Sequence, residues 1–141
     1  MFDYARADLS QTRMESAKEA LATAAENMNA GRYKAANNRA YYAMYHAIRA
    51  VLALDGAELG EQNKTIEYFN DNYLSSNLLD NYLKVVIEYA KDSCDRCDNE
   101  DYYVATHEET LRNISGAGDV LAAADSHIAS RLETESIQPV Q

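Results

Sequence analysis

The segment from Asn37 to Leu54 constrains the fold more than any other part of the chain. It runs for eighteen residues without glycine or proline. At 100° per residue, one narrow face of such a helix carries small side chains and a second face carries bulky apolar ones. The small face holds Ala36, Ala40, Ala43, Ala47, Ala50 and Leu54, and the bulky face holds Tyr41, Tyr45, Ile48 and Leu52. A surface helix has an apolar stripe of about 100°. This helix is apolar over roughly twice that arc, which predicts a central position with packing on two sides.

The remaining positions of this helix form one polar stripe, made of Arg39, Tyr42, His46 and Arg49. As a binding site, the two arginines would hold phosphate oxygens and His46 would shuttle a proton. As a structural feature, Arg39 would pair with acidic residues between 92 and 101, and His46 would be half-buried and hydrogen-bonded. Both interpretations stay open on the sequence alone.

Helices are predicted over residues 3–30, 32–54 (the central helix), 62–73 and 78–93. Gly31 and Gly56 are predicted to end the first two, and one face of the third is predicted to hold Ile66, Phe69, Asn70 and Tyr73. The core stripe of the 78–93 helix is predicted to contain Leu79, Tyr82, Leu83, Val86, Tyr89 and Ala90. A polar stretch over 91–103 is predicted to be a frayed helix end and a loop. A last helix begins at a capping box, with Thr106 at the N-cap and Glu109 three positions later. Its predicted buried seam contains Leu111, Ile114, Gly118, Leu121, Ile128 and Leu132. The small residues Gly116 and Gly118 are predicted to let another helix approach closely.

Four long helices with short connections predict an all-α fold, an antiparallel up-and-down bundle with one short extra helix. We expect one helical domain over residues 1–132 and a disordered tail over residues 133–141. A length of 141 residues suits one domain. No run of apolar residues is long enough for a transmembrane helix, and the acidic N-terminus does not resemble a signal peptide. We therefore expect a cytoplasmic protein without membrane contact.

Charge and cysteine spacing argue against two classes of site. The net charge of −10 disfavours unspecific nucleic-acid binding, although it leaves room for a local basic site. Cys94 and Cys97 lack the further ligands of a zinc site and the βαβ setting of a redox motif. The acidic residues Asp92, Asp95, Asp98, Glu100 and Asp101 are most simply a solvated cluster. We expect neither a metal nor a cofactor.

The run from Ala35 to Ala47, AANNRAYYAMYHA, resembles the opening of HEPN domains (higher eukaryotes and prokaryotes nucleotide-binding), of the small stand-alone prokaryotic kind. The resemblance continues through Leu54 and at Asn63-Lys64, and covers about residues 8 to 132. It implies an all-α bundle that forms homodimers. Many such proteins are metal-independent ribonucleases and toxins of toxin–antitoxin pairs. A common partner is a small MNT-type nucleotidyltransferase.

The active motif of this family is an arginine followed, after four to six residues, by a histidine. Arg96 matches the arginine, but the three positions allowed for the histidine hold Asp101, Tyr102 and Tyr103. Without the histidine, Asp101 is the substitute base, and a carboxylate is a weaker base than imidazole. His107 follows too late and is expected on the surface at a helix start. By resemblance, Tyr103 stands where a nucleotidyltransferase partner adenylylates the domain; packing at a loop or a dimer interface is the alternative.

Three function classes follow from these residues. The first is a dimeric HEPN-type module that binds a partner protein, a nucleotide or RNA, in a toxin–antitoxin or defence-like system, with a degenerate catalytic motif. The second is an active ribonuclease toxin that uses Arg96. The third is a helical scaffold without an enzymatic role. In the dimeric classes we expect residues 96–103 to lie near the symmetry mate, with Arg39 beside them.

Overall fold

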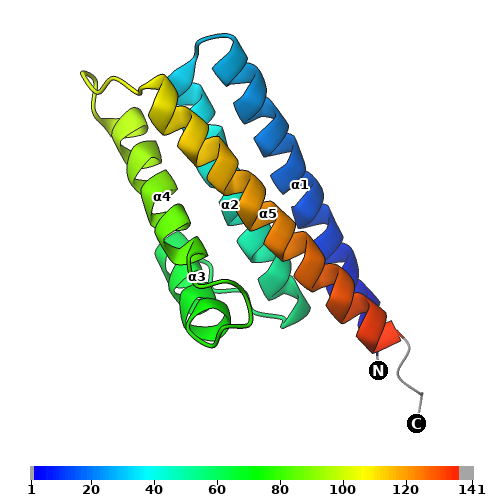
Figure 1. The fold of residues 1–141 in the computed structure, drawn as a ribbon. Helices are drawn as coiled ribbons and strands as arrows, with labels where there is room; N and C mark the ends of the chain where they lie inside the picture. The colour runs from blue at the N-terminus through cyan, green and yellow to red at the C-terminus, as the bar shows by residue number, and fades with distance from the viewer. Residues whose placement is uncertain (1, 137–141) are drawn as a thin grey trace.

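The computed structural model describes residues 2–136, which form an all-helical bundle (Figure 1). In chain order its elements are α1 (Tyr4–Asn29), α2 (Tyr33–Leu54), α3 (Gln62–Phe69), the π-helical turn η1 (Asn70–Leu74), α4 (Leu83–Asn99) and α5 (His107–Ser136). No residue between 2 and 136 belongs to a strand. The prediction of an all-α fold with four long helices and one short helix is confirmed.

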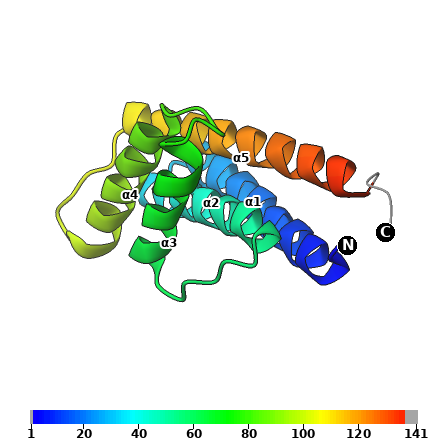
Figure 2. The same ribbon diagram turned by 90° about the horizontal axis from the view of Figure 1, so that it is seen from below.

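α2 lies at the centre of the bundle and contacts α1, α4 and α5 (Figure 2). The five alanines of its small face are each 0% exposed, so neighbouring helices approach this side closely. On its bulky face Tyr41, Ile48 and Leu52 are buried, while Tyr45 is half-buried. Both faces are therefore largely buried, and the predicted central position of α2 is confirmed. This burial removes most of the apolar surface of α2 from water.

The two glycines predicted to end the first helices do so. Gly31 follows α1 with a φ of +78°, and Gly56 follows α2 with a φ of +68°. These left-handed backbone conformations cost glycine little, because it has no Cβ. At Gly56 a Cβ would also lie 2.5 Å from the guanidinium of Arg6. The left-handed backbone conformation and the nearby Arg6 side chain therefore both favour glycine at the end of α2.

The short third helix changes its hydrogen-bonding pattern halfway. We predicted one helix over residues 62–73, and the structure instead has α3 up to Phe69 followed by the π-helical turn η1. The apolar face is as predicted, since Ile66, Phe69 and Tyr73 are all buried. The wider turn of η1 places Tyr73 and Leu74 in the core together.

α4 departs most from its prediction, because it begins at Leu83 and continues to Asn99. Residues 75–82 precede it as turns, with Asn77 at a positive φ and the Asp80 carboxylate accepting from the backbone N–H of Tyr82. Its buried positions are Leu83, Ile87, Ala90, Ser93 and Cys94. The predicted core positions Tyr82 and Tyr89 are wrong: they are 48% and 51% exposed, because the buried stripe leaves them on the outer side. Residues 91–99, predicted to be a fraying end and loop, are helical.

α5 begins with the predicted capping box. The Glu109 backbone N–H donates to Thr106 Oγ1 at 3.1 Å, and the Thr106 N–H donates to Glu109 Oε1 at 3.4 Å. Leu121 and Ile128 are buried as predicted, but Leu111 is 49% exposed, so its place in the seam was wrong. The helix extends to Ser136, beyond the point where a disordered tail was expected. The rest of that expected tail, residues 137–141, lies outside the described residues.

Buried polar side chains join α2 to α5. The Asn37 amide donates to Thr110 Oγ1 at 2.9 Å, and the Asn113 amide donates to Asn37 Oδ1 at 2.8 Å. Asn37 and Thr110 are 0% exposed and Asn113 is 2% exposed. Because an unpaired buried amide is costly, this set of bonds fixes one registry between the two helices.

Between residues 2 and 136 we find no helix that combines the length and apolar composition needed to cross a bilayer.

Candidate functional site

Arg96 lies in the last turn of α4, and its side chain is half exposed. Its Nε is 3.3 Å from Asp92 Oδ2, one helical turn earlier. Its guanidinium carbon also stands 5.6 Å from the centre of the Tyr103 ring. The structure therefore brings Arg96 and Tyr103 together, across the connection from α4 to α5.

Tyr103 is held by Glu109, the capping residue of α5. The Tyr103 hydroxyl donates to Glu109 Oε2, and the Ser93 hydroxyl donates to the same oxygen at 2.7 Å. Burial raises the pKa of Tyr103 to about 12, and its bond to the Glu109 carboxylate adds to the effect. Burial alone would raise the pKa of Glu109. The hydrogen bonds from Tyr103 and Ser93 outweigh burial, so this pKa lies below its usual value. At neutral pH the pair is a neutral phenol and an anionic carboxylate.

Other residues expected at the motif are placed differently. The Asp101 side chain is exposed, and its backbone carbonyl accepts from Lys34 Nζ at 3.4 Å. Tyr102 is 98% exposed. His107 is exposed at the start of α5, as predicted, with its ring 5.8 Å from that of Tyr33. Asp101 and His107 thus have their contacts with the start of α2 and not with Arg96.

The predicted polar stripe on α2 is a second cluster, which we call the α2 basic face. It comprises Arg39, Tyr42, His46 and Arg49, all half-buried, together with Tyr45 and with Arg13 from α1. Each arginine of α2 lies over a tyrosine ring: Arg39 is 5.2 Å from the centre of Tyr42, and Arg49 is 5.9 Å from that of Tyr45. Both α1 and α4 contact α2, the helix that carries most of this face.

Arg13 and Glu58 complete this face. Arg13 donates to the backbone carbonyl of Arg49 at 3.1 Å and to Glu58 Oε2 at 2.5 Å, while an Arg49 nitrogen is 3.5 Å from Glu58 Oε1. Burial lowers the pKa of His46, and the nearby charges of Arg49, Arg39 and Arg13 lower it further. Sequence analysis missed Arg13 and Glu58, because they are 36 and 9 positions from Arg49 and share no pattern with it.

Arg39 reaches α4 through its neighbour. Arg39 Nε donates to Asn38 Oδ1 at 3.0 Å, and the Asn38 amide donates to Asp98 Oδ2 at 3.0 Å. The acidic partner predicted for Arg39 is therefore bound by Asn38. Asp98 stands two positions after Arg96, about 200° around the helix. Arg39 is thus connected through Asn38 to Asp98, within the 96–103 segment, while Arg96 projects from another side of α4.

The two cysteines behave as structural thiols. Burial and the neighbouring Asp98 raise the pKa of Cys94 to about 12. Burial and Glu109 raise the pKa of Cys97 to about 11. A reactive cysteine needs a lowered pKa. Among residues 2–136, no three histidine, cysteine or acidic side chains are grouped as a metal site requires.

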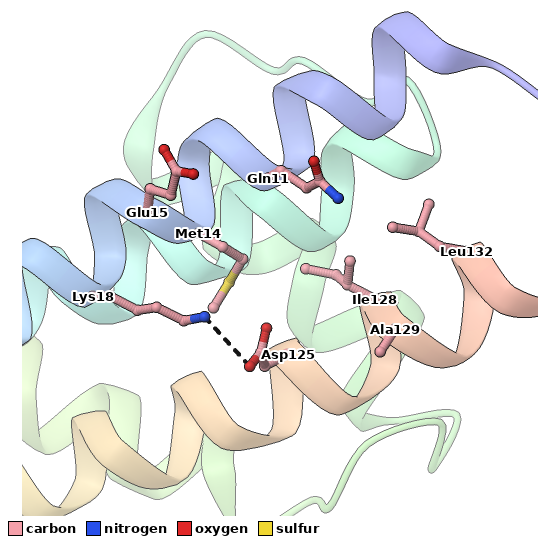
Figure 3. A pocket seen from close by; sticks show the side chains of 8 residues that line it. All are labelled: Gln11, Met14, Glu15, Lys18, Asp125, Ile128, Ala129 and Leu132. Carbon is pink, nitrogen blue, oxygen red and sulfur yellow. Dashed lines mark ion pairs between the residues drawn. The ribbon is translucent and has the colours of Figure 1, made fainter.

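Two surface recesses lie away from these residues. One, of about 270 Å³, lies between α1 and α5; Met14 and Ile128 line it, and the Lys18–Asp125 ion pair of 3.5 Å crosses it (Figure 3). The second, of about 320 Å³, is lined by residues of α3, η1 and α4, including Asn63, Lys84 and Lys91. Neither recess contains a residue predicted for the site.

Comparison with known proteins identifies the family to which this helical chain belongs. No curated protein matches the chain. The family model described as the HEPN domain matches residues 10–127, a span that begins within α1 and ends within α5. It includes α2, Arg96 and Tyr103. A match over most of the chain shows that the protein belongs to the HEPN domain family.

Proposed function

We propose that this protein is a dimeric HEPN module that binds a partner protein, a nucleotide or RNA and does not itself cleave RNA. The observation that carries this proposal is the surroundings of Arg96. Its neighbours are the carboxylate of Asp92 and the ring of Tyr103. The chain's three histidines have their ring contacts elsewhere: His46 near Tyr45, His107 near Tyr33 and His127 near Tyr73.

The protonation states of the Arg96 neighbourhood support this proposal. Metal-independent cleavage of RNA needs groups that take and give a proton near neutral pH. Tyr103 has a pKa of about 12 and stays protonated. Glu109 has a lowered pKa and stays ionised, which makes it a weak base. Asp92 serves Arg96 as an ion-pair partner. Neither Tyr103 nor Glu109 has the proton affinity that a histidine would supply.

An exposed apolar surface supports dimerisation. Tyr82, Val85 and Tyr89 follow one side of α4 in steps of three and four residues, and the same line continues to Asp92 and Arg96. Leu111 on α5 is exposed as well. We call Tyr82, Val85, Tyr89 and Leu111 the α4–α5 apolar face; each side chain is about half exposed. A dimer closed over this face would bury it and bring Arg96 and Tyr103 toward the second copy.

The resemblance also supports a paired partner, which we propose is an MNT-type nucleotidyltransferase in a toxin–antitoxin or defence-like system. Tyr103 is then the proposed site of modification. Its hydroxyl is bonded to Glu109, so a transferase must separate that pair to reach it.

Incubation of the purified full chain with total RNA tests the absence of cleavage. Wild type and Arg96→Ala should leave the RNA equally intact, because the motif lacks its proton-transfer group. Arg32→Ala, an exposed substitution with the same change in charge, is the control. Cleavage by wild type and by Arg32→Ala that disappears in Arg96→Ala would establish an active ribonuclease and overturn the proposal.

A further inference from the structure

The recess formed by α3, η1 and α4, which we call the α3–α4 recess, differs from the other recess in its charges. Between α1 and α5, the charges of Lys18 and Asp125 pair with each other. The α3–α4 recess has a volume of about 320 Å³, and its charged lining residues are Glu67, Asp71, Lys84, Glu88 and Lys91. Of these, only Lys91 has an ion-pair partner between residues 2 and 136, namely Asp95 at 3.6 Å. Charges of both signs therefore face the same recess without neutralising one another.

A buried amide oxygen without a donor belongs to the same recess. Asn70 lines it from the start of η1, and its Oδ1 is buried and accepts no hydrogen bond from residues 2–136. The backbone carbonyl of Asn70 is satisfied, because it accepts from the Ser75 N–H at 2.8 Å in the π-helical pattern. A buried acceptor without a donor costs stability, and π-helical turns occur frequently at functional sites. A ligand that donates a hydrogen bond to Asn70 would remove this cost.

The mixture of charges discriminates between classes of ligand. A simple anion would be attracted by Lys84 and repelled by the carboxylates of Glu67 and Glu88, and a simple cation would meet the opposite conflict. A molecule that carries both an ammonium and a carboxylate satisfies both kinds of charge. The volume is near the lower end of the range for ligand sites, roughly 300–1,000 Å³, which suits a molecule of amino-acid size.

We propose that the α3–α4 recess binds a free amino acid as a zwitterion. Lys84 holds the ligand's carboxylate, Glu67 and Glu88 hold its ammonium, and Asn70 Oδ1 accepts a hydrogen bond from it. This site is separate from the motif arginine, because Lys84 precedes Arg96 by 12 positions on α4, or about 18 Å along the helix axis. Lys84 and Glu88 also each precede a residue of the α4–α5 apolar face, about 100° around the helix. Ligand binding and dimerisation therefore use different sides of α4.

Proton–nitrogen correlation NMR of the isotope-labelled full chain tests this inference. Each of the common L-amino acids is titrated separately at low millimolar concentration. At least one should shift the amide signals of residues 63–75 and 84–91 in a saturable way, because these segments line the recess. For the strongest binder, the N-acetyl derivative lacks the ammonium and the α-amide lacks the carboxylate. Each derivative should bind about tenfold more weakly, since each loses a charge-assisted contact.

Substitutions in the recess separate ligand binding from folding. Lys84→Ala and Glu88→Gln should each weaken binding about tenfold. Lys64→Ala is the control for Lys84→Ala, because the Lys64 side chain is 68% exposed on α3 and is not part of the recess lining. It should bind within about twofold of wild type, as expected for a surface change away from the ligand. Asn70→Ala should weaken binding severalfold without lowering the unfolding temperature of the free protein, because it removes an unsatisfied acceptor. Thermal unfolding followed by circular dichroism measures that temperature.

Four outcomes would overturn the inference. They are no saturable shift with any of the amino acids, shifts confined to other surfaces, equal binding of the amino acid and its two derivatives, and equal loss of affinity in Lys64→Ala and Lys84→Ala. Displacement of the amino acid by glucose at equal concentration would assign the recess to neutral polyols and overturn it as well. A loss of binding in Arg96→Ala equal to that in Lys84→Ala would place the ligand at the motif, with the same consequence. Cleavage of RNA that depends on Arg96 would overturn the proposed function and leave this inference standing.

Discussion

At the scale of single residues, Glu109 connects local helix capping to the candidate site. One carboxylate oxygen accepts from the Thr106 backbone, and the other accepts from Tyr103 and Ser93. It therefore ties together the start of α5, the preceding loop and α4. Because Arg96 lies over the Tyr103 ring, the position of Arg96 depends on this carboxylate as well.

Replacing Glu109 by glutamine should destabilise the fold by about 1 to 2 kcal/mol at pH 7, since hydrogen bonds to a charged acceptor are stronger than those to a neutral one. The folded-state pKa of Glu109 is lowered from its ordinary value of 4.5. Its stabilising effect is therefore complete above that value and is lost as the pH falls through the folded-state pKa. Urea unfolding of wild type and variant at pH 7, and at a series of lower pH values down to the acid limit of folding, measures both expectations.

Glu108→Gln is the matched control, because Glu108 is exposed in the same first turn of α5 and loses the same charge. Its effect should stay within about 0.5 kcal/mol. An equal loss of unfolding free energy in the two variants would show that the effect comes from the negative charge at the start of α5. A loss in Glu109→Gln that persists at low pH would show that it comes from side-chain packing.

At the scale of elements, α4 packs closely against α5 at Gly116. A Cβ on this residue would lie 2.5 Å from Val86 Cγ1 and 3.4 Å from Met44 Cε. Small residues in α5 were predicted to permit such an approach, and Gly116 does so. At Gly118 no atom lies within 4 Å of the corresponding position, so the same prediction was wrong there.

These two glycines predict opposite effects of one substitution. Gly116→Ala should destabilise the protein by about 1 to 3 kcal/mol, because the branched Val86 side chain is stiff and must shift. Gly118→Ala should stabilise it by roughly 0.5 to 1 kcal/mol through the higher helix propensity of alanine. Chemical unfolding of both variants measures the difference. Similar changes of the same sign would show that α4 moves freely relative to α5.

At the scale of the whole molecule, the α4–α5 apolar face is the surface through which we propose that two copies meet. A stable interface buries about 800 Å² on each partner and has aromatic residues near its centre. Tyr89 lies on this face, with the Arg112 guanidinium 4.5 Å from its ring centre. It combines an aromatic surface with an adjacent charge, as interface residues often do.

Tyr89→Glu should convert a wild-type dimer to a monomer in light scattering coupled to size exclusion. The introduced carboxylate can pair with Arg112 within its own chain, so we expect the fold to be kept. Closing an apolar interface over the pair would remove its hydration, and that cost opposes dimerisation. Tyr4→Glu makes the same change at a residue that is 74% exposed on α1, and should leave the dimer intact. A wild-type monomer, or a dimer that survives Tyr89→Glu, would contradict dimerisation through this face.

Much of the fold was determined by the sequence alone, because it depends on interactions between near neighbours. The two apolar faces of α2, the glycines that end α1 and α2, and the capping box of α5 each involve residues only a few positions apart. Helical periodicity and local backbone preferences are sufficient to predict them. The motif residue Arg96 and the absence of its histidine are likewise visible without coordinates.

Only the tertiary structure decided which of these residues meet. The register of α4 turned Tyr82 and Tyr89 outward, because its buried stripe is selected by packing against α2 and α5 and not by local periodicity. Arg13, Arg49 and Glu58 come from α1, α2 and the following loop, and no local pattern relates them. Asn37 and Asn113, 76 positions apart, pair only once the helices have packed. Local sequence therefore determines the elements, and long-range packing determines the composition of the sites.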